Sequence, residues 1–248
     1  MEDEILNLQR PDGASLAYCY TSGRADVKGT TFVFLPGYMS DMEGGKAIAI
    51  DNWAKANGRA MLRLDYAGCG ASGGDFAEQS LIDWRDDVLL LIDKVTTGSI
   101  TLIGSSMGGW LMLLVALARP MRVKSMVGIA AAPDFTDWGF SQEQKMTILR
   151  DGKLEEPSEY SDDPYVTTRM FWQSGEANRL LHKEIAFDGP VRLIHGQMDE
   201  DVPWEYSLEL AKKIRSADVQ VHLVKDGTHR LSRDQDIDLL IDTISRLP

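Results

Sequence analysis

Cysteine is scarce in this chain of 248 residues, which contains only Cys19 and Cys69. The two residues lack the spacing of a metal or redox site, so the fold does not depend on a framework of disulfides. A reducing compartment is then the simpler assumption. No apolar run approaches the ~20 residues that a membrane-spanning helix needs, so stable insertion into a membrane is not expected.

Basic residues are outnumbered by acidic ones. The chain has 26 Lys and Arg against 38 Asp and Glu, which gives a formal net charge of −12. No basic cluster interrupts this balance, which argues against nucleic acid or an anionic membrane as a partner. The first five residues, MEDEI, lack the pattern of a secretory signal or of an Arg-rich transit peptide. The expected location is therefore the cytoplasm.

Repeats and low-complexity stretches are absent as well, and nothing divides the chain into independent units. Apolar segments rich in Val, Ile and Leu alternate with helical patterns. The expected strands cover residues 5–8, 15–20, 30–35, 60–64, 100–103, 123–131, 191–194 and 219–224, and the expected helices cover 43–56, 81–95, a stretch after 106, one from about 203, and 234–244. This order predicts one α/β domain over residues 1–248, with a mostly parallel central sheet and helices on both faces.

The stretch from Pro133 to Gly189 breaks the alternation and lies between two expected core strands. It has helical pieces of its own around residues 142–150 and 166–181, which predicts a small helical cap inserted above the carboxyl edge of the sheet. Its larger apolar side chains are candidate walls of a substrate pocket: Trp138, Met146, Leu149, Phe171 and Trp172. The alternative, weighed equally for each of them, is that these side chains only pack the cap against the core.

A GxSxG motif, Gly104-Ser105-Ser106-Met107-Gly108, follows an expected buried strand and precedes an apolar helical run. A serine on a sharp turn between strand and helix is projected away from the backbone, next to the free N–H groups of the helix start. Glycines at both ends of the motif suit a turn where side chains would collide. The context predicts that Ser106 is a nucleophile.

An acid and a base follow in the order Ser, Asp, His. Asp199 comes just after the expected strand 191–194, and His229 follows strand 219–224 in a loop. Open α/β sheets carry their sites along the carboxyl edge, where both residues are expected. Spacing alone does not exclude other candidates, which are Glu200, Asp201 and Asp134 as the acid and His182, His195 and His222 as the base.

The expected oxyanion donors are two backbone N–H groups. Strand 30–35 ends in Pro36-Gly37, a turn that leaves the N–H of Tyr38 free, and the N–H of Met107 comes directly after the candidate nucleophile. An ordinary turn at Pro36-Gly37 is the alternative. No group of His, Cys, Asp and Glu shows metal-ligand spacing, and no dinucleotide-binding glycine motif follows the first strand. Neither a metal nor a cofactor is expected.

Four segments carry a resemblance to a known family: residues 35–42 (LPGYMSDM), 63–72 (RLDYAGCGAS), 104–112 (GSSMGGWLM) with 118–120 (ARP), and 195–204, from His-Gly to Val-Pro-Trp. With them the chain resembles the α/β-hydrolase family, in particular its palmitoyl-protein thioesterases and acyl-glucuronide esterases. The similarity runs from about residue 20 to the C-terminus and is weakest in the cap. It implies the α/β-hydrolase fold, Ser106 as nucleophile, Asp199 as acid and His229 as base.

These features predict a cofactor-free serine hydrolase of carboxylic esters or thioesters. Its substrate is expected to be a small molecule or an acylated partner, and the chain is expected to be a monomer or a homodimer. A carbon–carbon bond hydrolase and a perhydrolase share the same triad and remain alternatives. A ligand receptor without activity would use the same pocket. Serine at position 106 disfavours the aspartyl-type dehalogenases and epoxide hydrolases.

Overall fold

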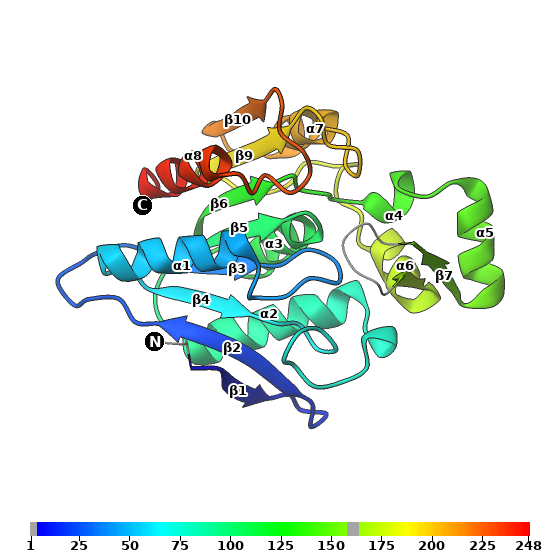
Figure 1. Ribbon diagram of the computed structural model, residues 1–248, viewed down its shortest axis with the longest axis horizontal. Coiled ribbons are helices and arrows are strands. Elements are labelled where there is room, and N and C mark those ends of the chain that lie inside the picture. Colours follow the sequence, from blue (N-terminus) through cyan, green and yellow to red (C-terminus); the bar gives the residue numbers. More distant parts are fainter. Residues whose placement is uncertain (1–3, 158–163) are drawn as a thin grey trace.

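The computed structural model describes residues 4–157 and 164–248, and a sheet of eight strands forms its centre (Figure 1). The strands lie in the order β1-β2-β4-β3-β5-β6-β9-β10. The predicted strands are confirmed, with ends displaced by at most two residues. Their bounds are β1 (Leu6–Gln9), β2 (Ser15–Thr21), β3 (Thr31–Leu35), β4 (Met61–Leu64), β5 (Ile100–Ser105), β6 (Val123–Ile129), β9 (Val191–Gly196) and β10 (Val219–Val224).

The sheet is antiparallel only at one edge. Strand β2 pairs antiparallel with β1 and β4, whereas all neighbours from β4 to β10 are parallel. Every residue of β3, β4 and β5 is buried, because helices cover both faces of these strands. Parallel strands of this kind end at a common carboxyl edge, so the loops that follow them lie side by side.

Two hydrophobic cores flank the sheet. Alternate residues of β3 point to opposite faces: Val33 and Leu35 belong to one core, and Phe32 and Phe34 to the other. The first core also contains residues of α2 (Leu81–Val95), α3 (Met107–Ala118) and α7 (Glu205–Lys213). The second core contains residues of α1 (Gly45–Asn57) and α8 (Asp234–Ser245). These two helices lie on the same face of the sheet in Figure 1.

Helix α2 begins where the sequence predicts. Ser80 accepts a hydrogen bond from the N–H of Asp83, and the Asp83 carboxylate accepts one from the N–H of Ser80. This reciprocal capping satisfies two N–H groups that the first helical turn otherwise leaves without partners. The helix then buries one apolar side, which includes Trp84 and Leu91.

The segment between β6 and β9 lies beyond the carboxyl ends of the parallel strands (Figure 1). It consists of α4 (Phe135–Trp138), α5 (Gln142–Asp151), β7 (Lys153–Glu156), β8 (Tyr165–Thr168) and α6 (Arg169–Ala177). The helix expected over residues 166–181 is wrong at both ends, because residues 165–168 pair with β7 and the helix ends at Ala177. Three β-branched residues, Val166-Thr167-Thr168, favour a strand, and the Thr168 hydroxyl then caps α6 at the N–H of Phe171.

Both cysteines are buried. Cys19 lies in β2 and Cys69 in the loop after β4, so neither is part of a disulfide. Among the helices of residues 4–157 and 164–248, none has the length and apolar character required to cross a membrane.

Candidate active site

Ser106 occupies the sharp turn between β5 and α3, as expected from the motif. Its backbone angles are φ 54° and ψ −121°, a left-handed conformation that is uncommon for a residue with a side chain. Such strain, of order 1–3 kcal/mol, persists only where surrounding contacts hold the residue in place. Here the backbone N–H of Ser106 donates to the backbone oxygen of Ile129 (2.9 Å), and the backbone oxygen of Ser106 accepts from the N–H of Ala132 (3.0 Å). The turn is therefore tied to the end of β6.

The glycines of the motif are required by close backbone approach. A Cβ atom at Gly104 would lie 2.3 Å from the oxygen of Gly108, and one at Gly108 would lie 2.1 Å from the oxygen of Leu35. A side chain at Gly104 would push the start of α3 away from β5, and one at Gly108 would push it away from the end of β3. Because β3 leads into the loop with the expected oxyanion donor, these contacts also set the distance between that loop and Ser106.

Two backbone N–H groups beside Ser106 are available to a ligand. Met107 is the first residue of α3, so its N–H has no partner within the helix. The Tyr38 N–H makes no hydrogen bond to any residue that the structure describes. A Cβ atom at Gly37 would lie 3.4 Å from the Ser106 Cβ, so the loop of Tyr38 passes directly over the serine. The geometry fits the expected oxyanion hole, although these roles stay predictions.

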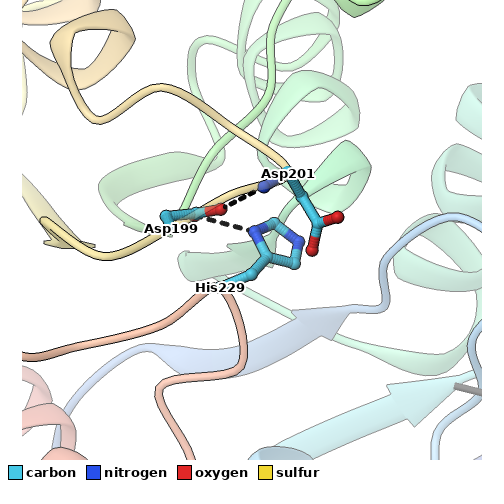
Figure 2. Close-up of side chains that lie close together, drawn as sticks. All are labelled: Asp199, Asp201 and His229. Carbon is cyan, nitrogen blue, oxygen red and sulfur yellow. Dashed lines mark hydrogen bonds and ion pairs between the residues drawn. The ribbon is translucent and has the colours of Figure 1, made fainter. Parts of the chain in front are cut away.

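Asp199 and His229 are joined by a hydrogen bond, as Figure 2 shows. His229 Nδ1 lies 2.8 Å from Asp199 Oδ2, although 30 residues separate them in sequence. The bond spans the loops after β9 and β10, which are neighbours in the sheet. The Asp199 carboxylate is buried, whereas 18% of the His229 side chain is exposed. His229 can therefore face a substrate while Asp199 stays behind it.

Asp199 is held as an anion. Burial alone raises the pKa of a carboxyl group, but here hydrogen bonds from His195 and His229 outweigh burial and leave the pKa of Asp199 well below its usual range. The backbone N–H groups of Asp201 (2.9 Å) and Val202 (2.8 Å) donate to the other oxygen, Oδ1. An anionic Asp199 accepts a hydrogen bond from Nδ1–H of His229, which leaves the lone pair of Nε2 free to accept a proton from a nucleophile.

No hydrogen bond joins Ser106 Oγ to His229 within the described part of the chain. In sites without substrate such bonds are often long and tighten only when a ligand binds. The separation of the two groups therefore does not argue against their cooperation.

The other candidate acids are placed differently from Asp199. Asp134 is buried, and its carboxylate accepts hydrogen bonds from the N–H groups of Leu180 (2.8 Å) and Leu181 (2.8 Å). Burial raises the pKa of Asp134 in spite of these bonds. Its role is to hold the chain that follows α6. Glu200 and Asp201 are exposed, and Asp201 contacts Asp199 through its backbone N–H.

His195, weighed as an alternative base, lies behind Asp199 and not in front of it. Its side chain is completely buried, and its Nε2 lies 3.1 Å from Asp199 Oδ2. Its Nδ1 lies 2.7 Å from the hydroxyl of Ser207 in α7. This link is not predictable from the sequence, because nothing in the spacing of His195 and Ser207 shows that the two side chains meet next to the acid.

The five cap residues expected to form a pocket do not share one environment. Phe171 is 1% exposed, whereas Met146 is 62% and Leu149 38% exposed. Trp138 stacks on Tyr206 with ring centroids 4.2 Å apart, and Trp172 donates from Nε1 to the oxygen of Thr136 (3.0 Å). Of the five, Phe171 lies against the Tyr38 ring, with centroids 4.8 Å apart. The substrate-binding role of all five stays a prediction.

One small cavity lies close to the turn of Ser106. A cavity of about 80 Å³ lies between the loop of Gly37 and the start of α1, and Ser105 and Lys46 line it. Burial lowers the pKa of Lys46 to about 8, and its ammonium group donates to the backbone oxygen of Arg230, next to His229. A larger cavity of about 230 Å³ lies at the distant edge of the sheet between β1, β2 and the end of α1.

Asp199, Asp201 and His229 also present oxygen and nitrogen atoms within 4.8 Å of one another (Figure 2). A metal ion held by all three residues would compete for Asp199 with the hydrogen bonds that its carboxylate already accepts. The existing hydrogen bonds already satisfy both oxygens of Asp199, so the group fits a hydrogen-bonded acid and base better than a set of metal ligands.

Comparison with known proteins supports the fold. A model of the alpha/beta hydrolase family matches residues 32–243. The chain is 41% identical over 244 residues to the palmitoyl-protein thioesterase ABHD10, mitochondrial, of Homo sapiens, with 97% of this chain and 78% of that protein covered. The solved structure of alpha/beta hydrolase domain-containing protein 10 from mouse superposes with a TM-score of 0.89 at 40% identity, covering 98% and 97% of the two chains. A putative hydrolase from Agrobacterium vitis superposes with a TM-score of 0.91 at 36% identity and the same coverage.

Proposed function

Because the chain belongs to the alpha/beta hydrolase family, we propose that it is a serine hydrolase of carboxylic esters or thioesters. Ser106 is the nucleophile, His229 the general base and Asp199 the residue that orients His229 and stabilises its charged form. The observation that carries the proposal is the hydrogen bond of 2.8 Å between His229 Nδ1 and Asp199 Oδ2, formed at the sheet edge that also carries the strained turn of Ser106.

The reaction follows from these positions. His229 Nε2 takes the proton of the Ser106 hydroxyl as Oγ attacks the acyl carbonyl carbon, and the carbonyl oxygen becomes an oxyanion. The N–H groups of Tyr38 and Met107 donate to that oxyanion, and each donor contributes about 3–4 kcal/mol to lowering the barrier. The imidazolium then gives its proton to the departing alcohol or thiol. Water, deprotonated by the same nitrogen, attacks the acyl-enzyme and releases the acid and free Ser106.

The acyl group is the part of the substrate that the cap is proposed to select. The relatives at about 41% identity are named palmitoyl-protein thioesterases, which makes an acyl thioester a substrate to test first. We propose that Phe171, next to Tyr38, borders the acyl site together with Trp138, Met146, Leu149 and Trp172. The excess of Asp and Glu favours a leaving group without several negative charges.

Location and assembly are separate questions. The curated relatives are named as mitochondrial proteins, whereas the composition of this chain predicts a cytoplasmic one, and the location stays a prediction. The same holds for the expectation of a monomer or homodimer.

Active-site labelling and hydrolysis together test the proposal. A fluorophosphonate probe is expected to label the parent protein, and p-nitrophenyl esters and acyl thioesters of graded chain length are expected to be hydrolysed. Ser106→Ala should abolish labelling and lower kcat by about 10⁴-fold or more. Ser105→Ala, which removes the neighbouring hydroxyl, is the matched control. Hydrolysis by Ser106→Ala at the parental rate would overturn the assignment, and a parent that binds esters but neither reacts nor hydrolyses would be a receptor.

A further inference from the structure

One oxygen of Asp199 lies within hydrogen-bond distance of two imidazole rings. Its Oδ2 lies 2.8 Å from His229 Nδ1 and 3.1 Å from His195 Nε2. His229 sits in an exposed loop after β10, whereas His195 is the fifth residue of β9 and is completely buried. The proposed mechanism uses only His229, so the second imidazole requires an explanation of its own.

The tautomer of His195 follows from its partners. Nε2 also lies 3.0 Å from the backbone oxygen of Val202, which can only accept a hydrogen bond. Nε2 must therefore carry a proton, which it shares between Val202 and Asp199. At Nδ1 the Ser207 hydroxyl, 2.7 Å away, donates to the lone pair of the neutral ring. Ser207 itself is 1% exposed, so water does not compete for this contact.

Four N–H groups consequently converge on the Asp199 carboxylate. Three of them, from His195, Asp201 and Val202, belong to β9 and the turn that follows it, and their positions are set by the buried strand. The fourth comes from His229, in a separate loop. The three N–H groups from β9 and its turn therefore fix the plane of the Asp199 carboxylate, and with it the direction in which Oδ2 faces His229.

We propose that His195 is a positioning residue, which through its Nε2–H fixes Oδ2 of Asp199 toward His229 and is itself fixed by Ser207. This inference rests on the proposed function, because it assigns His195 a role in the Ser106, His229 and Asp199 reaction. Donation by His195 also withdraws charge from Oδ2, so the carboxylate attracts the Nδ1 proton less strongly. The proton then stays on His229 when the imidazolium forms.

Two amide substitutions separate donation from packing. In His195→Gln the side-chain NH₂ reaches approximately the position of Nε2 and can still donate to Asp199. In His195→Asn the shorter side chain reaches approximately the position of Nδ1, so the contact with Ser207 is kept and donation to Asp199 is lost. Both variants are neutral and polar, and they differ by one methylene. His195→Asn therefore leaves more empty space in the core than His195→Gln, and a comparison of their unfolding free energies reports this packing difference separately from kcat.

We expect His195→Asn to lower kcat by about ten- to a hundredfold, as for loss of one hydrogen bond to a charged group, with little change in KM. His195→Gln should stay within about threefold of the parent. Thermal unfolding of the two variants, measured in parallel, shows whether both are folded. Equal kcat in the two folded variants, whether reduced or parental, would overturn the proposal. Ser207→Ala, with a smaller expected loss of kcat, replaces His195→Asn if that variant does not fold.

A double-mutant cycle with Asp199→Ala gives the second readout. If His195 acts through Asp199, His195→Asn should cause no further loss of kcat once the carboxylate is absent. A loss of the same factor in both backgrounds would mean that His195 acts on the structure alone and would contradict the proposal. Failure of the proposed function would look different, because Ser106→Ala would then keep its activity whatever residue stands at position 195.

Discussion

The hydroxyl of Tyr38 donates a hydrogen bond of 2.5 Å to the backbone oxygen of Val166 in β8. Through this bond the loop that supplies a proposed oxyanion donor is tied to the segment between β6 and β9. The Tyr38 ring also contacts Phe171, Phe135 and Trp84 at centroid distances of 4.8–6.0 Å. Burial raises the pKa of Tyr38 far above its usual value, so the hydroxyl remains a neutral donor throughout the pH range of an assay. The position of β8 and the geometry of the oxyanion loop are thereby linked.

Tyr38→Phe tests this link. The substitution keeps the backbone N–H and the ring contacts but removes the donor to Val166, so we expect the free energy of unfolding to fall by about 1 kcal/mol. Fluorophosphonate labelling of Ser106 should continue. Urea unfolding measures the difference, and Tyr206→Phe, whose hydroxyl makes no hydrogen bond to a described residue, is the matched control. Equal losses in the two variants would show that the Tyr38 bond contributes nothing specific.

Asp199→Asn should impair catalysis more than it impairs the fold. An amide at position 199 can donate to His229 Nδ1, which favours the tautomer with the proton on Nε2 and removes the acceptor for the Ser106 proton. We expect kcat to fall by up to about 10⁴-fold. Asp134→Asn is the comparison, because the Asp134 carboxylate accepts hydrogen bonds from the N–H groups of Leu180 and Leu181. An inactive Asp134→Asn beside an active Asp199→Asn would mean that the acid has been assigned to the wrong strand.

Features that depend on residues close together in the chain could be predicted from the sequence. The start of α2 follows from Ser80 and Asp83, which cap the helix without help from the rest of the fold. Ser106 could be recognised because its turn is encoded by neighbours within four residues. In contrast, Tyr165–Thr168 pairs with β7 across residues 158–163, which lie outside the described residues, and helical periodicity after Val166 hid the strand.

The arrangement around Asp199 shows where prediction from sequence ends. Asp199 and His229 could be placed at the same sheet edge because both follow parallel strands. That His195 also reaches Asp199, and that Ser207 sets its tautomer, depends on how α7 packs beside β9 and leaves no periodic signal. The expected pocket walls were chosen by residue type alone. That choice grouped the exposed Met146 with the buried Phe171, since side-chain hydrophobicity does not reveal which side of a helix faces inward.

Asp199 should also make stability depend on pH. Its pKa is lowered in the folded protein, so the folded state binds a proton less readily than the unfolded chain. Such a group stabilises the fold at pH values above its unfolded pKa of about 3.9, and the contribution is lost as the pH falls toward the lower, folded pKa. We expect the difference in unfolding free energy between the parent and Asp199→Asn to be constant from pH 7 to about pH 5 and to shrink below about pH 4. Urea unfolding across this range measures it, and a difference that grows on acidification would contradict the argument.

The last prediction concerns the acyl group. Phe171 is buried against Tyr38 and Trp84, so Phe171→Ala opens space beside the oxyanion loop. Each additional methylene that this space buries contributes about 0.8 kcal/mol, or roughly a fourfold gain. The ratio of kcat/KM for long over short p-nitrophenyl esters should therefore rise.

The experiment must separate selectivity from loss of structure, because truncating a buried Phe costs about 3–5 kcal/mol of stability. Phe171→Leu removes less volume and should shift the same ratio by a smaller factor. Met121→Ala changes a residue that is 82% exposed after α3 and serves as the control. Labelling of Ser106 should persist in every variant, since neither the turn nor His229 is altered. If both Phe171 variants are folded and labelled but retain the parental chain-length profile, Phe171 only packs the cap against the core, and acyl selection must lie with other residues.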